Sequence, residues 1–381
     1  MTHPSPLWLC PDQVFDGQSL LAGMAVCVQA GKVVALRRLA DLPEGAERRA
    51  VAGILTAGYL DLQVNGGGGA LVNNDPTVAA MQTIAAAHRR FGTVGVLPTV
   101  ITDAPEVLAA AVEAAIAAKG MQGILGLHIE GPHISLPRRG THAVEYVRPL
   151  DKATIAHVAR LRAEGVRVKI TLAPEAVQRG QIAELVALGA IVSLGHTDTT
   201  AEAVQAALAE GATCFTHLFN AMSPMLNRAP GVTGAAINSD AYCGFICDGH
   251  HVADAMLGLA IRARPVADRM FLVSDAMATV GGGDRFWLYG REIRLVDGML
   301  VNAEGSLAGA HVTMAESVAR LVRVLGIAPE AALRMAVTVP AELIGAPELA
   351  QIVGRGLDDL LVLGADMTPT GTCVAAVAAA A

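Results

Sequence analysis

The stretch VRVKITLAPEAVQRGQIAELVALGAIVSLGH, residues 166–196, contains the unit that decides the fold. An apolar run of strand length at 166–172 is followed by a segment of helical length, and a second apolar run follows at 190–194. Strands that are apolar along their whole length are buried on both faces, which is typical of parallel sheets covered by helices. The stretch therefore predicts a strand–helix–strand unit.

The same unit recurs along the chain from about residue 59. Stretches 76–90 and 104–119 have the length and periodicity of helices that connect such strands. Eight apolar strands alternating with helices predict an α/β fold, a closed TIM-like (β/α)8 barrel. The link from the sixth run to the seventh is rich in Pro, Asn and Gly, so we expect an active-site loop there. The eight runs are 59–64, 94–98, 124–129, 166–172, 190–194, 213–216, 243–247 and 270–273.

The two ends of the chain have a different pattern. Runs 24–28 and 33–36 flank a short Gly-containing turn and predict a β-hairpin, and 357–363 is a further strand candidate. Neither end is long enough to bury a core alone. We therefore expect a small β-sandwich domain built from residues 1–56 plus 346–381, with the catalytic barrel, 57–345, inserted between its halves.

Composition excludes several classes of protein. The net charge of −7 gives no electrostatic footprint for nucleic acid or an anionic membrane. Hydrophobic residues reach 53%, but the longest uncharged stretch, 211–227, is shorter than the ~20 apolar residues of a spanning helix. No secretory signal precedes Asp12, and the six cysteines form no CxxC pair. We expect a cytoplasmic protein with reduced thiols.

Polar side chains end most of the predicted barrel strands. In a (β/α)8 barrel the active site lies at the carboxyl ends of the strands, so these residues should converge on one rim. Two histidines and a carboxylate form a common catalytic zinc site, with one position left open for water. The strand-end residues are Asp61, Gln63, Asn65, Glu130, His196, His217, Asp248 and Asp275.

An ordered series of short motifs carries a resemblance to a known family. Between about residues 58 and 309 the chain resembles the N-acetylglucosamine-6-phosphate deacetylases of the amidohydrolase superfamily. The resemblance implies metal-dependent hydrolysis of N-acetylglucosamine 6-phosphate to glucosamine 6-phosphate and acetate. The motifs are GYLDLQVNG (58–66), HIEGP (128–132), GTH (140–142), LGHT (194–197), HLFNAM (217–222), DGHH (248–251) and SDA (274–276).

The resemblance also implies how a metal is held. Glu130, His196 and His217 correspond to the ligands of a single divalent ion, for which zinc is the best expectation, with iron and manganese as alternatives. The first-strand His-x-His of the superfamily is absent, and Gln63 and Asn65 stand in its place. Neutral amides are weak ligands for transition metals, so a second site there should be weak or empty.

Further roles follow from the same resemblance. Asp275 matches the catalytic aspartate that takes a proton from water and later delivers it to the departing amine. His142 matches the histidine that hydrogen-bonds the acetamide carbonyl, and His128 is expected beneath the rim. Asn220, Ala221, Arg228 and His251 match the phosphate contacts. In the family the matching arginine crosses a two-fold interface, so we expect a homodimer in which Arg228 serves the neighbouring subunit.

Three alternatives remain open at this point. The same chemistry could act on N-acetylgalactosamine 6-phosphate or on a non-phosphorylated N-acyl compound. A catalytically silent barrel should lack a ligand or the strand-eight aspartate, and all of them are present. A cyclic-amide hydrolase generally uses His-x-His with a carboxylated lysine, but Lys169 lies inside its run rather than at the end.

Overall fold

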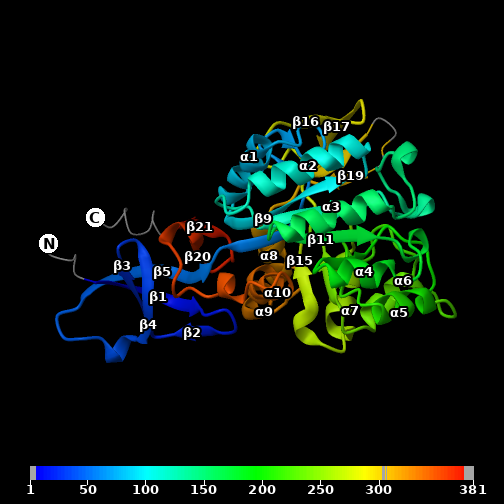
Figure 1. Cartoon of the computed structure of the whole chain (residues 1–381). Coiled ribbons are helices and arrows are strands. Elements are labelled where there is room, and N and C mark those ends of the chain that lie inside the picture. Colours follow the sequence, from blue (N-terminus) through cyan, green and yellow to red (C-terminus); the bar gives the residue numbers. More distant parts are fainter. Residues whose placement is uncertain (1–5, 303–304, 306, 373–381) are drawn as a thin grey trace. The chain divides into compact units, whose positions relative to one another are not determined.

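The computed structural model describes residues 6–302, 305 and 307–372 (Figure 1). The chain divides into two compact units. The described parts of Met1–Leu60, Phe91–Val94 and Met314–Ala381 form the first, and those of Asp61–Arg90 and Gly95–Thr313 form the second. The domain boundaries expected from the sequence stay a prediction.

Eight parallel strands form one sheet, as the apolar runs predict. The last strand returns to the first, because Asp275 N donates to Gln63 O over 3.0 Å and Asn65 N to Ala276 O over 2.9 Å. The sheet is therefore a nearly closed barrel, and the predicted (β/α)8 fold is confirmed. Its strands in order are β6 (Tyr59–Val64), β9 (Thr93–Ile101), β10 (Gly126–Glu130), β11 (Arg167–Leu172), β12 (Ile191–Leu194), β13 (Cys214–Phe215), β14 (Tyr242–Phe245) and β15 (Met270–Leu272).

The second barrel strand is longer than the sequence suggests. The apolar run expected from the sequence covers 94–98, although proline is disfavoured inside central strands. In the structure β9 continues to Ile101, and its register against β10 shifts by one residue between the pairs Val96↔Ile124 and Thr99↔His128. Pro98 lies at this irregularity, where the pattern of ladder hydrogen bonds is already interrupted.

Helices follow the first seven strands of the barrel and supply its outer layer (Figure 1). Both predicted helices are confirmed, and the side chain of Thr77 caps the first by accepting a hydrogen bond from Ala80 N. The link after the sixth strand contains the predicted loop, but a seven-residue helix, α6, then follows it. These helices are α1 (Val78–Arg89), α2 (Pro105–Ala117), α3 (Lys152–Ala163), α4 (Gln181–Ala187), α5 (Ala201–Ala209), α6 (Gly231–Ile237) and α7 (Asp254–Ala263).

A four-stranded antiparallel sheet follows the last barrel strand and was not predicted from the sequence. Phe286, Leu288 and Ile293 of this sheet belong to a buried cluster that also contains Ile101 and Met277. The cluster packs the sheet against Ile101, the last residue of β9, and against Met277 in the segment after β15. Its strands are β16 (Arg285–Leu288), β17 (Arg291–Val296), β18 (Met299–Val301) and β19 (Leu307–Ala310).

Strands from both ends of the chain share one seven-stranded sheet in the first unit. The predicted hairpin is confirmed as β3 paired with β4, whereas only the end of 357–363 is a strand, because Leu357–Asp359 forms a 3-10 turn. Among the described residues of the first unit, the strands belong to this one sheet. A second sheet packed against it, as in a sandwich, therefore stays a prediction. The strands are β1 (Leu7–Phe15), β2 (Leu20–Ala22), β3 (Met24–Gln29), β4 (Lys32–Arg38), β5 (Glu47–Ala57), β20 (Leu360–Leu363) and β21 (Pro369–Thr372).

Three further helices lie in the first unit: α8 (Met314–Arg323), α9 (Pro329–Leu333) and α10 (Val339–Leu343). Across the described ranges, no helix has the length and apolar character needed to cross a membrane. Five cysteines are free thiols, four of them buried, and Cys373 lies outside the described residues.

Candidate active site

Most of the predicted rim residues come together at the carboxyl ends of the barrel strands, but Asp61 lies within β6 and not at its end. Glu130 is the last residue of β10, and His196 and His217 lie two positions beyond β12 and β13. Asp275 follows β15, and Asn65 follows β6. These five residues line one cavity of ≈ 220 Å³, although they come from five separate strand ends.

Three of these side chains form a triangle of potential metal ligands. Oε1 of Glu130 lies 3.2 Å from Nε2 of His196 and 3.1 Å from Nε2 of His217. The two Nε2 atoms are 3.0 Å apart. Ligands at ~2.0–2.1 Å from a tetrahedral zinc ion are separated by about 3.3 Å. The spacing and the donor types therefore fit a divalent transition metal.

A third histidine beside this triangle makes the ligand set less obvious. Single ligand atoms of Glu130, His142 and His196 also lie within 4.8 Å of one another. Nδ1 of His196 is 2.8 Å from the carbonyl oxygen of Arg138, which can only accept. His196 Nδ1 therefore carries its proton, and the Nε2 lone pair faces the triangle as a metal ligand requires.

The backbone at the site is held in an unfavourable conformation. His196, His217, Ala221 and Asp275 have φ values of +48°, +30°, +52° and +51°. Residues other than glycine rarely adopt positive φ, and each such residue costs about 1–3 kcal/mol. Residues of this kind cluster at functional sites, where the surrounding structure enforces a side-chain direction.

Two amides of the first strand bind the two carboxylates. Gln63 Nε2 donates to both oxygens of Glu130, over 3.0 and 3.1 Å, and to Oδ1 of Asp275 over 3.2 Å. Asn65 Nδ2 donates to the same Oδ1 over 2.7 Å. Both amide oxygens are buried and have no hydrogen-bond partner in the described part of the chain. To bind a second metal through oxygen, these amides would have to turn away from the carboxylates.

The surroundings of Glu130 and Asp275 shift the pKa values of these two carboxyl groups in opposite directions. Burial would raise the pKa of Glu130, but the closeness of the His196 and His217 imidazoles outweighs this effect and holds the pKa well below its usual value. Burial, aided by the charge of Glu130, raises the pKa of Asp275. One carboxylate is thereby suited to stay ionised as a ligand and the other to carry a proton.

Three of the four predicted phosphate contacts line the same cavity. They are Asn220, Ala221 and His251. The Nδ2 group of Asn220 is buried without a hydrogen-bond partner among the described residues, so it is available to a ligand. His251 Nδ1 pairs with Asp248 Oδ2 over 2.6 Å. The fourth predicted contact, Arg228, is exposed and is not among the described residues that line the cavity of its own chain.

A layer of polar side chains lies inside the barrel beneath the rim. Nδ1 of His128 is 3.2 Å from Thr99 Oγ1, and its Nε2 is 2.7 Å from Thr171 Oγ1. Both nitrogens are thus occupied inside the barrel, which agrees with a position beneath the ligands. Lys169 is also fully buried, within β11 rather than at its end. Asp61 accepts from Ser274 N, and burial raises its pKa to about 7.

The structure adds a residue that sequence reasoning missed. Thr102 Oγ1 lies 2.7 Å from Nδ1 of His142, one of the predicted site residues. Thr102 directly follows β9, so it would have been inspected as a strand-end residue if the strand had not been ended at Pro98.

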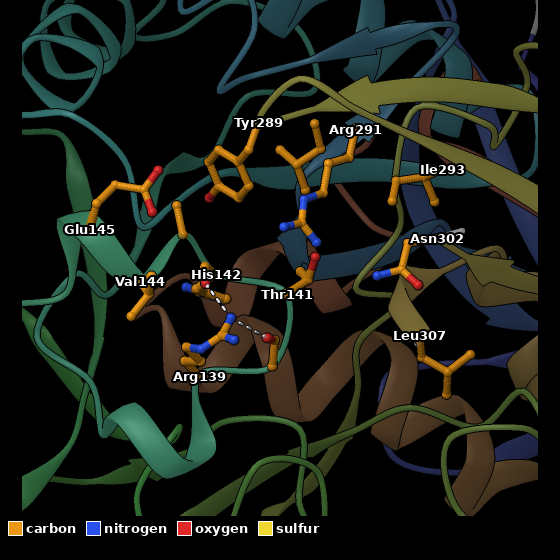
Figure 2. Close-up of a pocket in the computed structure, with 13 residues that line it drawn as sticks. Arg139, Thr141, His142, Val144, Glu145, Tyr289, Arg291, Ile293, Asn302 and Leu307 are labelled. Carbon is orange, nitrogen blue, oxygen red and sulfur yellow. Dashed lines mark hydrogen bonds between the residues drawn. The ribbon is translucent and has the colours of Figure 1, made fainter. Parts of the chain in front are cut away.

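His142 and its neighbours also separate the site from a second cavity of ≈ 550 Å³ (Figure 2). Its opposite wall contains Tyr289 and Arg291 of the unpredicted sheet. Arg139 lies beside His142 and donates hydrogen bonds to the carbonyl oxygens of Gly140 and His142 over 3.3 and 3.2 Å. The side chain of Arg139 and the hydroxyl of Thr102 therefore both contact the segment that carries His142.

Comparisons with known proteins agree on one group of relatives. The chain is 41% identical over 350 residues to the N-acetylgalactosamine-6-phosphate deacetylase of Shewanella sp. (strain ANA-3), covering 90% of this chain and 84% of the relative. It is 32% identical over 369 residues to the N-acetylglucosamine-6-phosphate deacetylase of Haemophilus influenzae, covering 95% and 96%. The crystal structure of N-acetylglucosamine-6-phosphate deacetylase from Pasteurella multocida superimposes with a TM-score of 0.89 at 35% identity, covering 96% and 97%. No protein-family model matches the chain.

Proposed function

The chain belongs to the N-acetylglucosamine-6-phosphate deacetylase family of the amidohydrolase superfamily, and from this premise we propose its reaction and the roles of its residues. The enzyme hydrolyses the acetamide of N-acetylglucosamine 6-phosphate, giving glucosamine 6-phosphate and acetate. One observation carries the assignment of the site. The Glu130, His196 and His217 triangle lies beside Asp275 in a cavity that also contains Asn220 and His251.

Glu130, His196 and His217 would hold one divalent cation, for which Zn²⁺ fits best and Fe²⁺ or Mn²⁺ would also serve. A cation bound there supplies Lewis acidity and lets water lose a proton near neutral pH. Burial of the three residues, at most 5% exposed, excludes competing solvent from the ligand atoms. Gln63 orients Glu130 through its two hydrogen bonds.

Asp275 transfers a proton from the attacking water to the departing amine. Hydrogen bonds from Asn65 and Gln63 hold Oδ1, which leaves Oδ2 to accept the proton of the attacking water. The raised pKa of Asp275 then favours delivery of that proton to the departing amine, since an amide anion is a very poor leaving group. His142 donates a hydrogen bond to the acetamide oxygen as negative charge develops on it.

The phosphate is bound at the other side of the cavity, by Asn220 and the backbone of Ala221 together with His251. Arg228 completes this pocket from the neighbouring subunit of a homodimer. Its exposed position away from its own cavity supports this role. In a C2 dimer each subunit would lend one arginine and receive one. The five free cysteines support the proposal of a cytoplasmic enzyme.

Acetate release from the two phosphosugar epimers and from their unphosphorylated forms, N-acetylglucosamine and N-acetylgalactosamine, tests the substrate. N-acetylglucosamine 6-phosphate should be turned over with a far higher kcat/KM than N-acetylglucosamine, because the unphosphorylated sugar leaves the anion contacts unused. Comparable kcat/KM values with and without phosphate would contradict the phosphosugar assignment. N-acetylgalactosamine 6-phosphate is the second candidate, favoured by the 41% identity to the Shewanella enzyme. If the enzyme prefers that epimer, N-acetylgalactosamine 6-phosphate is the substrate and the proposed mechanism stays the same.

One metal ion per chain should be sufficient for activity. The amides of Gln63 and Asn65 are occupied as donors to Glu130 and Asp275, so a second ion would find only neutral oxygens and would disrupt these bonds. Titrating Zn²⁺ into the metal-free enzyme should restore full activity at about one equivalent. Activity that rises until two equivalents are bound would overturn this proposal.

Mixed dimers test the role of Arg228. The Arg228→Ala enzyme should raise KM for the phosphosugar by roughly 10–150-fold, the equivalent of ~1.5–3 kcal/mol for a hydrogen bond to a charged group. Combining Arg228→Ala chains with Asp275→Asn chains should then restore one wild-type site per mixed dimer, because one site pairs intact Asp275 with intact Arg228. No recovery after verified subunit exchange would place Arg228 outside the neighbour's site.

A further inference from the structure

The turn between β16 and β17 holds a tyrosine where turn geometry disfavours one. Leu288 pairs with Arg291 across the turn, and Tyr289 and Gly290 have φ values of +52° and +72°. Two-residue hairpin turns with positive φ at both positions favour Asn, Asp or Gly at the first. A large side chain in this conformation persists where the surrounding structure enforces it, often at a functional site. We therefore expect Tyr289 to have a function other than closing the hairpin.

The Tyr289 hydroxyl donates a hydrogen bond to the carbonyl oxygen of Thr102. The hydroxyl of the same threonine lies 2.7 Å from Nδ1 of His142. Figure 2 shows Tyr289 and His142 on the wall of one cavity. The position of the Thr102 hydroxyl also depends on Gly131, because a Cβ atom at Gly131 would collide with it. A continuous path of contacts therefore runs from the hairpin turn to the His142 ring.

His142 and His196 differ in the hydrogen-bond partner of their Nδ1 atoms. His196 Nδ1 faces a carbonyl oxygen, which accepts only, so its Nε2 must be the unprotonated nitrogen. His142 Nδ1 faces a hydroxyl, which is able to donate. When Thr102 donates to Nδ1, the proton of the neutral ring lies on Nε2. Nε2 of His142 is then a hydrogen-bond donor toward the site and not a metal ligand.

We infer that Thr102 and Tyr289 are positioning residues for the deacetylation: Tyr289 holds the Thr102 backbone, and the Thr102 hydroxyl keeps His142 in the Nε2–H form that binds the acetamide oxygen. The inference rests on the proposed function for the identity of that oxygen. The tautomer itself is a property of the protein and can be measured without substrate.

Substitutions at Thr102 test the hydroxyl directly. Thr102→Val keeps the shape but cannot donate, so kcat should fall by ~10–100-fold, the range for partners that orient site residues. KM should change little, because the phosphate contacts lie elsewhere in the cavity. Thr102→Ser should recover most of the lost rate. In ¹⁵N-histidine NMR spectra, where His142→Asn identifies the His142 signals, the wild type should show protonated Nε2, and Thr102→Val should shift this ring toward the other tautomer.

Tyr289→Phe provides a second test with a matched control. This variant removes one oxygen atom, so it carries the test even if Thr102→Val folds poorly. The control is Tyr59→Phe, because the buried Tyr59 hydroxyl has no hydrogen-bond partner among the described residues. Tyr289→Phe should lower kcat and broaden or shift the His142 signals, and Tyr59→Phe should change neither.

Two outcomes would overturn the inference. The first is a wild-type His142 with its proton on Nδ1, and the second is equal kcat in the Tyr289→Phe and Tyr59→Phe enzymes. Failure of the wild type to release acetate from either phosphosugar would instead contradict the proposed function, and the NMR spectra would still decide the tautomer.

Discussion

An Asp275→Asn enzyme should bind one metal ion per chain, as the wild type does, and lose nearly all turnover. Asp275 is outside the ligand triangle, and an asparagine keeps its shape and can still accept the hydrogen bond from Asn65. The amide cannot take up the proton of the attacking water, and a general base typically contributes ~10²–10⁴ in rate. Metal content by emission spectroscopy and kcat on the same preparation would measure both effects.

An exposed carboxylate provides the control for this variant. Asp240 lies on the surface after α6, so Asp240→Asn changes the same functional group without touching the site. It should leave both metal content and kcat at wild-type values. Loss of a general base should leave no more than about a hundredth of the wild-type kcat. If Asp275→Asn retained more than about a tenth, the proton-transfer role would be wrong.

His196→Ala and His217→Ala enzymes should lose both metal and activity. Each variant leaves two protein ligands, and a transition-metal site of this class needs three. Both imidazoles are buried, and the neighbouring His142 is expected to face the site with its Nε2–H, so it should not replace either one. His157→Ala, on the half-buried face of α3, is the control and should retain its metal.

His142→Ala separates the two ligand sets that the geometry allows. If the metal is held by Glu130, His196 and His217, this variant should keep its metal and lose ~10²–10³ in kcat, the cost of one oxyanion donor. If His142 were a ligand in place of His217, the metal would leave with it. Full metal occupancy in His217→Ala, with loss in His142→Ala, would reverse the assignment.

Much of the barrel and most of the candidate site could be predicted from the sequence. Strand burial is a local property, since an apolar run such as 166–172 has only one stable environment in a parallel sheet. Once the strands are ordered, their carboxyl ends share a rim by the rules of the fold. Glu130 and His196 could therefore be placed together although 66 positions separate them, because each lies at the end of a predicted strand.

The unpredicted sheet shows where local patterns were available but unused. Asp297 and Gly298 form the turn between β17 and β18, and Asp-Gly between alternating apolar residues is a strong hairpin signal. The second strand differs in the opposite direction, because the run 94–98 is three residues shorter at its carboxyl end than β9, which continues past Pro98 to Ile101. With the strand ended at Pro98, Thr102 was not considered as a strand-end residue.

By itself the sequence determined the barrel, the order of its strands and which polar side chains reach the rim, because periodicity and strand ends are local properties. Only the tertiary structure decided what those side chains do to one another. The amide nitrogens of Gln63 and Asn65 face carboxylates, and Tyr289 reaches Thr102 across 187 positions of chain. Such contacts depend on side-chain direction and on how loops pack, which are set by the whole fold and not by the residues adjacent in sequence.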